Sequence, residues 1–239
     1  KRLIRTLATM GYNALQLYTE DTYELQGYPY FGYMRGRYST GELREIDDFA
    51  YSLGIEVIPC VQTLAHMNQF LRHANISAKY KDIDDILEVG NPDVCDLVER
   101  IIRTLKNTFR TNRIHVGMDE AYNVGRGRYL DKNGYQTRKQ VLVRHLEFLD
   151  ELSKKYDVDM MMWDDMFHLM EDSALKEVPK DVIMVSWNYD YIDRAVPGQF
   201  RNNYRRELFC EYERLGIKYL PACWSNFDFN IDTLTALGE

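Results

Sequence analysis

The chain has 239 residues, of which 45% are hydrophobic and 28% are charged, and its formal net charge is −7. This composition is typical of a globular protein with one large core, and the dispersed lysines and arginines lack the basic patch of a nucleic-acid binder. No stretch approaches the roughly 20 apolar residues that a membrane-spanning helix needs. We therefore expect neither nucleic acid nor a membrane as a partner.

Six short apolar stretches have the character of strands, and amphipathic segments lie between them. The predicted strands, in chain order, cover residues 14–18, 55–61, 113–118, 159–163, 182–187 and 217–223. The predicted helices cover residues 2–10, 41–53, a segment that starts at 91, 137–156 and 203–215. Few polar residues interrupt the strands, as is typical of parallel strands that are covered on both faces.

Two of the predicted helices carry clear signals for their first residue. Ser39 and Glu42 have the spacing of a capping box, and Gly54 can end that helix. Asn91 is a suitable N-cap in front of Pro92, and the apolar residues that follow form one stripe at helical spacing.

The alternation of strand and helix predicts right-handed βαβ units and a parallel sheet. We expect a (β/α)8 TIM barrel in one domain over residues 1–239, a fragment of a longer chain with about six of the eight βα units. An open doubly wound sheet is the structural alternative. Against it, the residues after the first strand are Thr19-Glu20-Asp21-Thr22, which do not form a glycine-rich phosphate loop.

The four cysteines, Cys60, Cys95, Cys210 and Cys223, lie far apart and form no C-x-x-C pair. A structural zinc site and a dense disulfide framework are therefore not expected, and buried thiols are the simplest interpretation. This cysteine usage favours a reducing compartment, so we expect a cytoplasmic protein. Separately, we expect no cofactor.

Carboxylates, amides and all three tryptophans fall at or just beyond the ends of the predicted strands. In a parallel α/β barrel the catalytic groups stand at these carboxyl ends. The candidates, strand by strand, are Glu20-Asp21, Gln62 to His66, Asp119-Glu120, Trp163-Asp164-Asp165, Trp187-Asn188-Tyr189 and Trp224-Ser225-Asn226. Polar groups interleaved with indole rings suit a sugar. One tryptophan alone is more often a core residue and one aspartate a helix cap, so the combination carries the prediction.

Asp119 and Glu120 are the strongest catalytic candidates. Adjacent residues in a strand point to opposite faces, so both reach one pocket only if the strand ends at or just before them, which Gly117 permits. Two close carboxylates raise the proton affinity of one, which leaves a proton donor beside an anion. Glycosidic bond cleavage needs this division, because one group protonates the leaving oxygen and the other stabilises positive charge on the sugar.

The stretch His115-Val116-Gly117-Met118-Asp119-Glu120 resembles the H-x-G-x-D-E signature of family 20 glycoside hydrolases, the β-N-acetylhexosaminidases. Thr19-Glu20-Asp21 is similar to the family's T-D-D segment, residues 56–66 to its E-x-I-P-E-I-D-x-P-G-H strand, and Trp163-Asp164-Asp165 to its W-D-E element. The resemblance extends over essentially the whole chain.

The resemblance implies a retaining exo-β-N-acetylhexosaminidase that removes terminal N-acetylhexosamine from glycans by substrate-assisted catalysis. In this mechanism the sugar's own 2-acetamido oxygen attacks the anomeric carbon and forms an oxazolinium intermediate. Asp119 is expected to orient the acetamido group, and Glu120 to act as acid and then as base.

The resemblance also implies roles for the residues around this pair. The expected pocket walls are Trp163, Trp187 and Trp224, and Asp165 is the expected partner of a sugar hydroxyl. His66 is expected to pair with Asp21, and His115 to face Gln62. For either histidine taken alone, a satisfied core imidazole is the more common interpretation.

Several positions depart from the family's pattern. Cys60, Gln62, Leu64 and Ala65 replace the usual Glu, Asp, Pro and Gly, so an amide stands where a carboxylate normally supports the second histidine. The family's sugar-binding arginine belongs to a first strand that this chain lacks. Tyr189 or Tyr191 is the available substitute for its acetamido-binding tyrosine. These departures indicate a divergent branch of the family.

Two other functions are compatible with the sequence. A sugar-binding barrel without catalysis needs neither carboxylate, so the presence of Asp119 and Glu120 argues against it. A metal-dependent hydrolase that uses His66, His115 and strand-end carboxylates needs several ligands on one ion, but no H-x-H or H-E-x-x-H spacing is present. The expected partner is a glycan or glycoconjugate. The choice between N-acetylglucosamine and N-acetylgalactosamine stays open, as does a homodimer.

Overall fold

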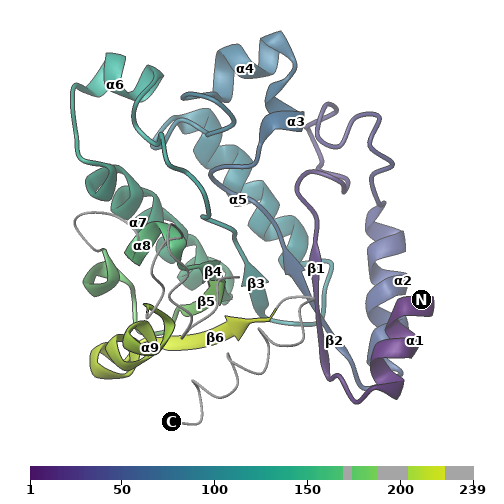
Figure 1. Ribbon diagram of the computed structural model, residues 1–239. Coiled ribbons are helices and arrows are strands. Elements are labelled where there is room, and N and C mark those ends of the chain that lie inside the picture. The colour runs from purple at the N-terminus through teal and green to yellow at the C-terminus, as the bar shows by residue number, and fades with distance from the viewer. Residues whose placement is uncertain (169–173, 188–203, 224–239) are drawn as a thin grey trace, which may run out of the picture.

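The computed structural model describes residues 1–168, 174–187 and 204–223, and in the last range the side chains from residue 207 on. Within these residues one parallel sheet of six strands forms the centre (Figure 1). The strands are β1 (Ala14–Tyr18), β2 (Glu56–Cys60), β3 (Arg113–His115), β4 (Asp159–Trp163), β5 (Ile183–Trp187) and β6 (Lys218–Ala222).

The strands follow one another across the sheet in the order in which they occur in the chain. Each strand pairs in parallel with its neighbours in sequence. In Figure 1 the strands turn from the upright β1 to the horizontal β6, so the sheet curls. A doubly wound sheet reverses its strand order at a switch point. The uninterrupted order contradicts that alternative and agrees with the predicted α/β class and with part of a barrel wall.

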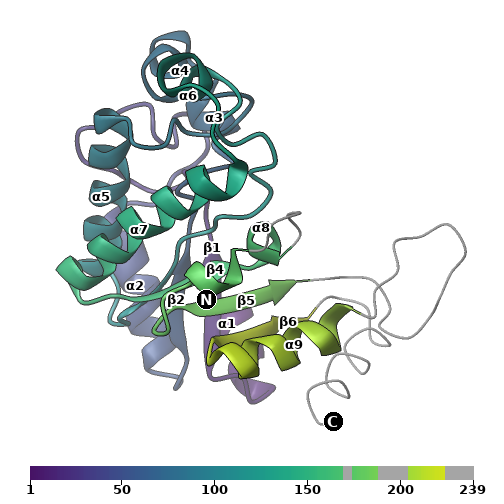
Figure 2. The ribbon, with the colours of Figure 1, turned by 90° about the vertical axis from the view of Figure 1, so that its left-hand side faces the viewer.

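Helices connect the strands and lie along the outside of the sheet (Figure 2). The five predicted helices are present as α1 (Arg2–Thr9), α2 (Thr40–Tyr51), α5 (Pro92–Lys106), α7 (Arg138–Tyr156) and α9 (Tyr204–Leu215). The structure adds the short helices α3 (Asn68–Leu71), α4 (Ala74–Tyr80), α6 (Arg128–Asn133), α8 (Asp165–His168) and η1 (Leu175–Glu177). Of the helices described, none has the length and apolar character needed to cross a membrane.

Local hydrogen bonds fix where the longer helices begin. Ser39 Oγ accepts the Glu42 N–H at 3.2 Å, and the Glu42 carboxylate accepts the Ser39 N–H at 2.8 Å, which confirms the predicted capping box. The Asn91 side chain accepts the Asp93 N–H at 2.9 Å, in front of Pro92. Such caps stabilise a helix because they satisfy backbone donors that have no partner inside it.

The third strand is shorter than predicted, and the reason lies in its backbone. β3 ends at His115, whereas the sequence predicts a strand to residue 118. Gly117 and Met118 have φ angles of +80° and +84°, which lie in the left-handed region and not in that of a strand. The chain therefore leaves the strand direction just before Asp119 and Glu120.

Apolar side chains cover both faces of the sheet. Along β4, Met160 and Met162 belong to the large cluster that the helices share, whereas Met161 packs with Ile58 and Val185 in a separate cluster. Alternate residues of a strand point to opposite faces. The two clusters therefore explain why the strands are continuous apolar runs in the sequence.

His145 on α7 is a buried histidine that links stability to pH. It is 1% exposed, and burial lowers its pKa to about 4 against the opposing effect of a hydrogen bond with the Thr63 backbone. In an unfolded chain a histidine titrates near pH 6.5. The unfolded state therefore takes up this proton first as the pH falls, so the folded state loses stability below about pH 6.5.

We expect His145→Gln to remove this contribution. Between pH 7 and pH 5 the full-length wild-type protein should lose about 2 kcal/mol more free energy of unfolding than the variant. Denaturant unfolding of both proteins at the two pH values measures this difference, in which the other titrating groups cancel. Equal losses in the two proteins would mean that the His145 imidazole is not held neutral by the fold.

Candidate active site

The predicted site residues that the structure describes lie at the carboxyl ends of neighbouring strands. They are Asp21 after β1, Gln62 and His66 after β2, His115 at the end of β3, Asp119 and Glu120 after β3, Trp163 and Asp165 around the end of β4, and Trp187 at the end of β5. The predicted Tyr189, Tyr191 and Trp224 lie outside the described residues. Because parallel strands present their carboxyl ends at one edge, these side chains form a single candidate site.

Two side chains hold the carboxylate of Asp119, one on each oxygen. Gln62 Nε2 donates to Oδ1 at 2.9 Å, and His66 Nε2 lies 3.1 Å from Oδ2. The hydrogen bond with Asp119 is the main reason why the pKa of His66 rises to about 9. His66 is therefore a charged donor at neutral pH, and two N–H donors stabilise the negative charge on Asp119.

Glu120 lies beside this arrangement and is open to solvent. Its side chain is 41% exposed, compared with 15% for Asp119, and Glu120 Oε2 is 3.5 Å from His66 Nε2. His66 therefore stands within reach of both carboxylates. The held, half-buried Asp119 and the accessible Glu120 therefore occupy different environments.

A left-handed backbone brings the two carboxylates to the same side. Glu120 has a φ of +54°, and it follows the left-handed residues Gly117 and Met118. His66 has a φ of +57°. Non-glycine residues with positive φ are uncommon and concentrate at functional sites. The sequence prediction that the strand must end before Asp119 is therefore confirmed. The left-handed residues Gly117 and Met118 turn the chain out of the strand direction.

Gly117 also makes room for the Gln62 side chain. A Cβ atom at Gly117 would lie 2.1 Å from Gln62 Oε1 and 2.8 Å from the Val61 carbonyl oxygen. Any side chain at this position would therefore push Gln62 away from Asp119, in addition to the cost of its positive φ. The glycine serves both the turn and the contact between Gln62 and Asp119.

Asp165 accepts a hydrogen bond from the backbone of Glu120. It is 1% exposed, and it accepts the Glu120 N–H at 2.9 Å and the Trp187 Nε1–H at 3.3 Å, one on each oxygen. Burial is the main reason why its pKa rises to about 7. These two contacts give Asp165 a positioning role for the Glu120 backbone and the Trp187 ring, and its predicted contact with a sugar hydroxyl stays a prediction.

The ring of His115 packs against the ring of Trp163. The ring centroids of His115 and Trp163 are 4.4 Å apart, and His115 Nδ1 accepts the Gly117 N–H at 3.2 Å. Burial lowers the pKa of His115 to about 3, so the imidazole is neutral. No hydrogen bond joins it to Gln62, whose amide donates to Asp119 and, at 3.4 Å, to the Tyr18 hydroxyl. The expectation that these two side chains face each other stays a prediction, without a hydrogen bond between them.

The predicted pair of Asp21 and His66 is wrong. Asp21 Oδ1 accepts from Arg35 at 2.5 Å and Oδ2 accepts the Gly32 N–H at 3.3 Å. Arg35 also binds Glu20 at 2.9 Å. The guanidinium of Arg35, in the loop after β1, is the partner of the Asp21 carboxylate. His66 contacts Asp119 instead. No spacing in the sequence identifies Arg35 as this partner.

Sequence reasoning also missed two tyrosines at the site. Tyr18, the last residue of β1, is 50% exposed and accepts the weak hydrogen bond from Gln62. Tyr122 is 49% exposed and follows Asp119 and Glu120, with its N–H donated to the Glu120 carbonyl at 2.8 Å. Both present aromatic surface next to Asp119 or Glu120, and the sequence signal for each is only its position beside a strand end.

The described residues contain free thiols and no cluster of metal-binding side chains. All four cysteines are unbridged, but Cys60 alone is buried, Cys95 is half-buried, and Cys210 and Cys223 are exposed. Burial raises the pKa of the Cys60 thiol to about 12. Among residues 1–168, 174–187 and 204–223, no group of three or more His, Cys, Asp or Glu side chains is arranged to hold a metal ion.

Solved structures share this fold at low sequence identity. An exo-β-N-acetylglucosaminidase of glycoside hydrolase family 20 from Vibrio harveyi, in complex with N-acetylglucosamine, superposes with a TM-score of 0.70 and 18% identity, over 92% of this chain and 38% of that one. A β-N-acetylhexosaminidase from Bacteroides fragilis gives a TM-score of 0.71 and 17% identity, over 93% and 46%.

Curated relatives and a family model match the sequence itself. "Hexosaminidase D" of Homo sapiens is 29% identical over 228 residues, and its Bos taurus counterpart is 28% identical over 191 residues. These matches cover 90% and 75% of this chain but 44% and 55% of the relatives, so the chain spans about half their length. The model of the glycosyl hydrolase family 20 catalytic domain matches residues 1–206. The chain therefore belongs to glycosyl hydrolase family 20.

Proposed function

We propose that the protein is a retaining exo-β-N-acetylhexosaminidase, which removes terminal N-acetylglucosamine or N-acetylgalactosamine from glycans through an oxazolinium intermediate. The observation that carries the proposal is the arrangement of Asp119, whose two oxygens are held by Gln62 and His66 while Glu120 stands exposed beside it. Membership of family 20 and the names of the relatives support the same class of substrate.

Asp119 has the environment of a group that stabilises positive charge. In the proposed reaction the 2-acetamido oxygen attacks the anomeric carbon, and positive charge spreads over the acetamido carbon and nitrogen. Asp119 accepts the acetamido N–H and lies against this charge. Because Gln62 and His66 fix the carboxylate before the reaction, little reorganisation is needed as the charge develops.

Glu120 has the access that an acid–base group needs. It protonates the glycosidic oxygen while the bond between that oxygen and the anomeric carbon breaks. It then takes a proton from the water molecule that opens the oxazolinium ring and restores the acetamido group. Each step inverts the anomeric carbon, so the two together retain its configuration.

Other parts of the proposal extend the site and the fold. Trp163 and Trp187 wall the pocket, and Trp224 and Tyr189 complete it beyond the described residues. The six strands then represent six of the eight βα units of a (β/α)8 barrel. A cytoplasmic location remains a prediction from the cysteine usage.

Dependence on the acetamido group tests the mechanism. Full-length protein should release chromophore from aryl β-N-acetylglucosaminide or β-N-acetylgalactosaminide at least ~10³-fold faster than from the aryl β-glucoside, because the glucoside lacks the intramolecular nucleophile. Comparable rates on the glucoside would mean that an enzyme side chain is the nucleophile. A folded protein that binds both acetamido sugars without cleaving either would be the sugar-binding barrel.

A further inference from the structure

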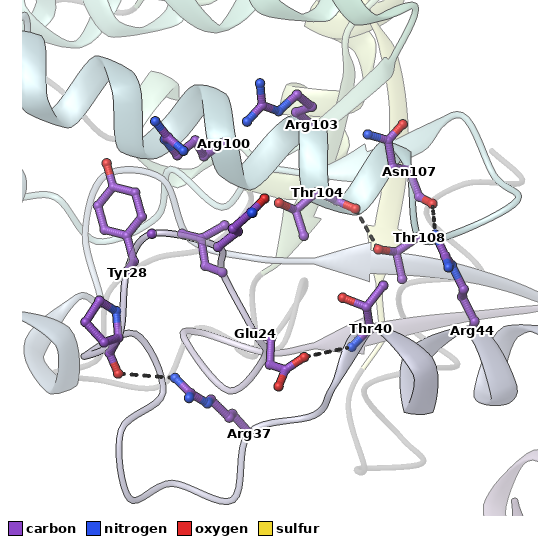
Figure 3. Close-up of a pocket in the computed structure, with 14 residues that line it drawn as sticks. Glu24, Tyr28, Arg37, Thr40, Arg44, Arg100, Arg103, Thr104, Asn107 and Thr108 are labelled. Carbon is purple, nitrogen blue, oxygen red and sulfur yellow. Dashed lines mark hydrogen bonds between the residues drawn. The ribbon is translucent and has the colours of Figure 1, made fainter.

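A cavity lies between the loop after β1 and the helices α2 and α5 (Figure 3), and none of the candidate active-site residues lines it. Its volume is about 610 Å³. Four arginines line it, namely Arg37 from the loop, Arg44 from α2, and Arg100 and Arg103 from α5. Glu24 is the one carboxylate among the lining residues, so the fold gathers positive charge here in a chain whose net charge is −7.

Three of these guanidinium groups have no carboxylate partner among the described residues. Arg37 donates to two backbone carbonyls of its own loop, at 3.2 and 2.9 Å. Arg44 donates to the Asn107 carbonyl near the end of α5, at 3.1 Å. Arg103 forms no hydrogen bond or ion pair with a described residue, and the longer-range fields of the Asp96 and Glu99 carboxylates act on it. Neutral carbonyls orient the first two but leave their charge uncompensated.

The fourth arginine is fixed in place and keeps free donors. Arg100 Nε donates to Asp96 at 2.9 Å, and its guanidinium lies 5.9 Å from the ring centroid of Tyr28. The Tyr28 hydroxyl donates to the same carboxylate at 2.7 Å. A guanidinium has five N–H groups, and this contact occupies only Nε, so its terminal nitrogens remain available to a ligand.

The wall of the cavity is rigid because its loop belongs to the core. Tyr28 and Phe31 are buried, and both rings pack against Phe70, at centroid distances of 6.5 and 5.5 Å. Arginines that the protein already orients cost less conformational entropy when they bind a ligand. The three arginines that contact the protein therefore differ from freely moving basic side chains on a surface.

We propose that this cavity binds a small polar molecule that carries a phosphate or sulfate ester. Guanidinium groups bind such tetrahedral oxyanions through paired, charge-assisted hydrogen bonds. Glu24, which accepts the Thr40 N–H at 3.4 Å, also lines the cavity as an acceptor for a ligand hydroxyl. The arginines thus bind the phosphate or sulfate group, and the remaining volume of the cavity accommodates the rest of the polar molecule.

Calorimetric titration of the full-length protein with glucose 6-phosphate, glucose 6-sulfate and glucose tests this proposal. The esters should bind and glucose should not. Arg44→Gln combined with Arg103→Gln should weaken ester binding at least ~10-fold, because each arginine contributes a charge-assisted hydrogen bond. Arg138→Gln, an exposed arginine on α7 outside the cavity, is the matched control and should bind like the wild type.

The titrations show which of the two esters binds, and they also include outcomes that would overturn the proposal. Binding of one ester alone identifies phosphate or sulfate as the group that is recognised. Higher ionic strength should weaken binding, because most of these arginines are exposed. No binding of either ester to the wild type, or binding that the double variant retains, would overturn the proposal. The assay measures binding and not hydrolysis, so its outcome is independent of the proposed catalytic function.

Discussion

Replacing Glu120 by glutamine should lower kcat for aryl β-N-acetylglucosaminides by about 10²- to 10⁴-fold, the contribution of a positioned acid–base group. Glutamine keeps nearly the same size and retains the backbone N–H that Asp165 accepts, but it cannot transfer the proton. The loss should be smaller for a dinitrophenyl than for a nitrophenyl glycoside, since the better leaving group departs without protonation. Steady-state kinetics of the full-length protein with both substrates measure this.

The matched control is Glu147→Gln, which changes an exposed glutamate on α7. This variant should keep wild-type kinetics on both substrates. If Glu120→Gln lost activity equally on the two leaving groups, the residue would not be the acid. If it kept most of its activity on both, another group would transfer the proton.

The second large effect is expected for Asp119→Asn, which should lower kcat by at least ~10²-fold. Gln62 and His66 both donate to the carboxylate, whereas an asparagine amide offers one acceptor oxygen and turns its NH₂ group toward the other donor. The variant therefore loses the negative charge and also one of the two contacts that orient the side chain. Turnover of aryl N-acetylglucosaminide measures the loss.

The charge of His66 gives an independent readout of the same variant. Its pKa is raised to about 9 chiefly by Asp119, so in Asp119→Asn it should fall toward the ordinary value near 6.5. An NMR titration of the imidazole reports this without reference to activity. Asp21→Asn is the control, because Arg35 and not His66 holds Asp21. A His66 pKa that follows Asp21 would contradict the geometry of the site.

Elements with their own local signals could be predicted from the sequence. β1 and β4 have the predicted bounds, 14–18 and 159–163, because each is an apolar run that polar residues end. The helix after Ser39 begins where its capping box predicts. β3 was predicted too long, because the apolar character of Val116 and Met118 conceals a left-handed turn that only Gly117 hints at.

Elements that depend on distant contacts could not be predicted. The segment before α6 is held by the buried Asp82, which accepts the N–H groups of Gly125 and Tyr129 at 2.8 Å from more than 40 residues away. No periodicity marks a helix of six residues that is fixed in this way. The arginine cavity has the same origin, because Arg37, Arg44 and Arg103 are dispersed in the sequence and converge only in the fold.

The candidate site also has a part that could be predicted from the sequence and a part that could not. Asp119 and Glu120 could be identified because adjacent carboxylates at a strand end have few structural explanations. The partners of His66 and Asp21 could not be predicted, because they depend on side chains that only the fold brings together, Asp119 beside His66 and Arg35 beside Asp21. Gln62 was recognised as a departure from the family pattern, and the structure gives it a specific contact, the N–H donated to Asp119.

Inhibition by a thiazoline mimic of the oxazolinium ion tests the proposed role of the pair most directly. The full-length wild-type protein should bind this mimic much more tightly than N-acetylglucosamine, because it resembles the charged intermediate. Asp119→Asn should weaken the inhibition at least ~10-fold, since the carboxylate no longer faces the ring nitrogen. A wild-type protein that cleaves aryl N-acetylglucosaminide but ignores the mimic, or a variant that binds it equally well, would contradict substrate-assisted catalysis by Asp119 and Glu120.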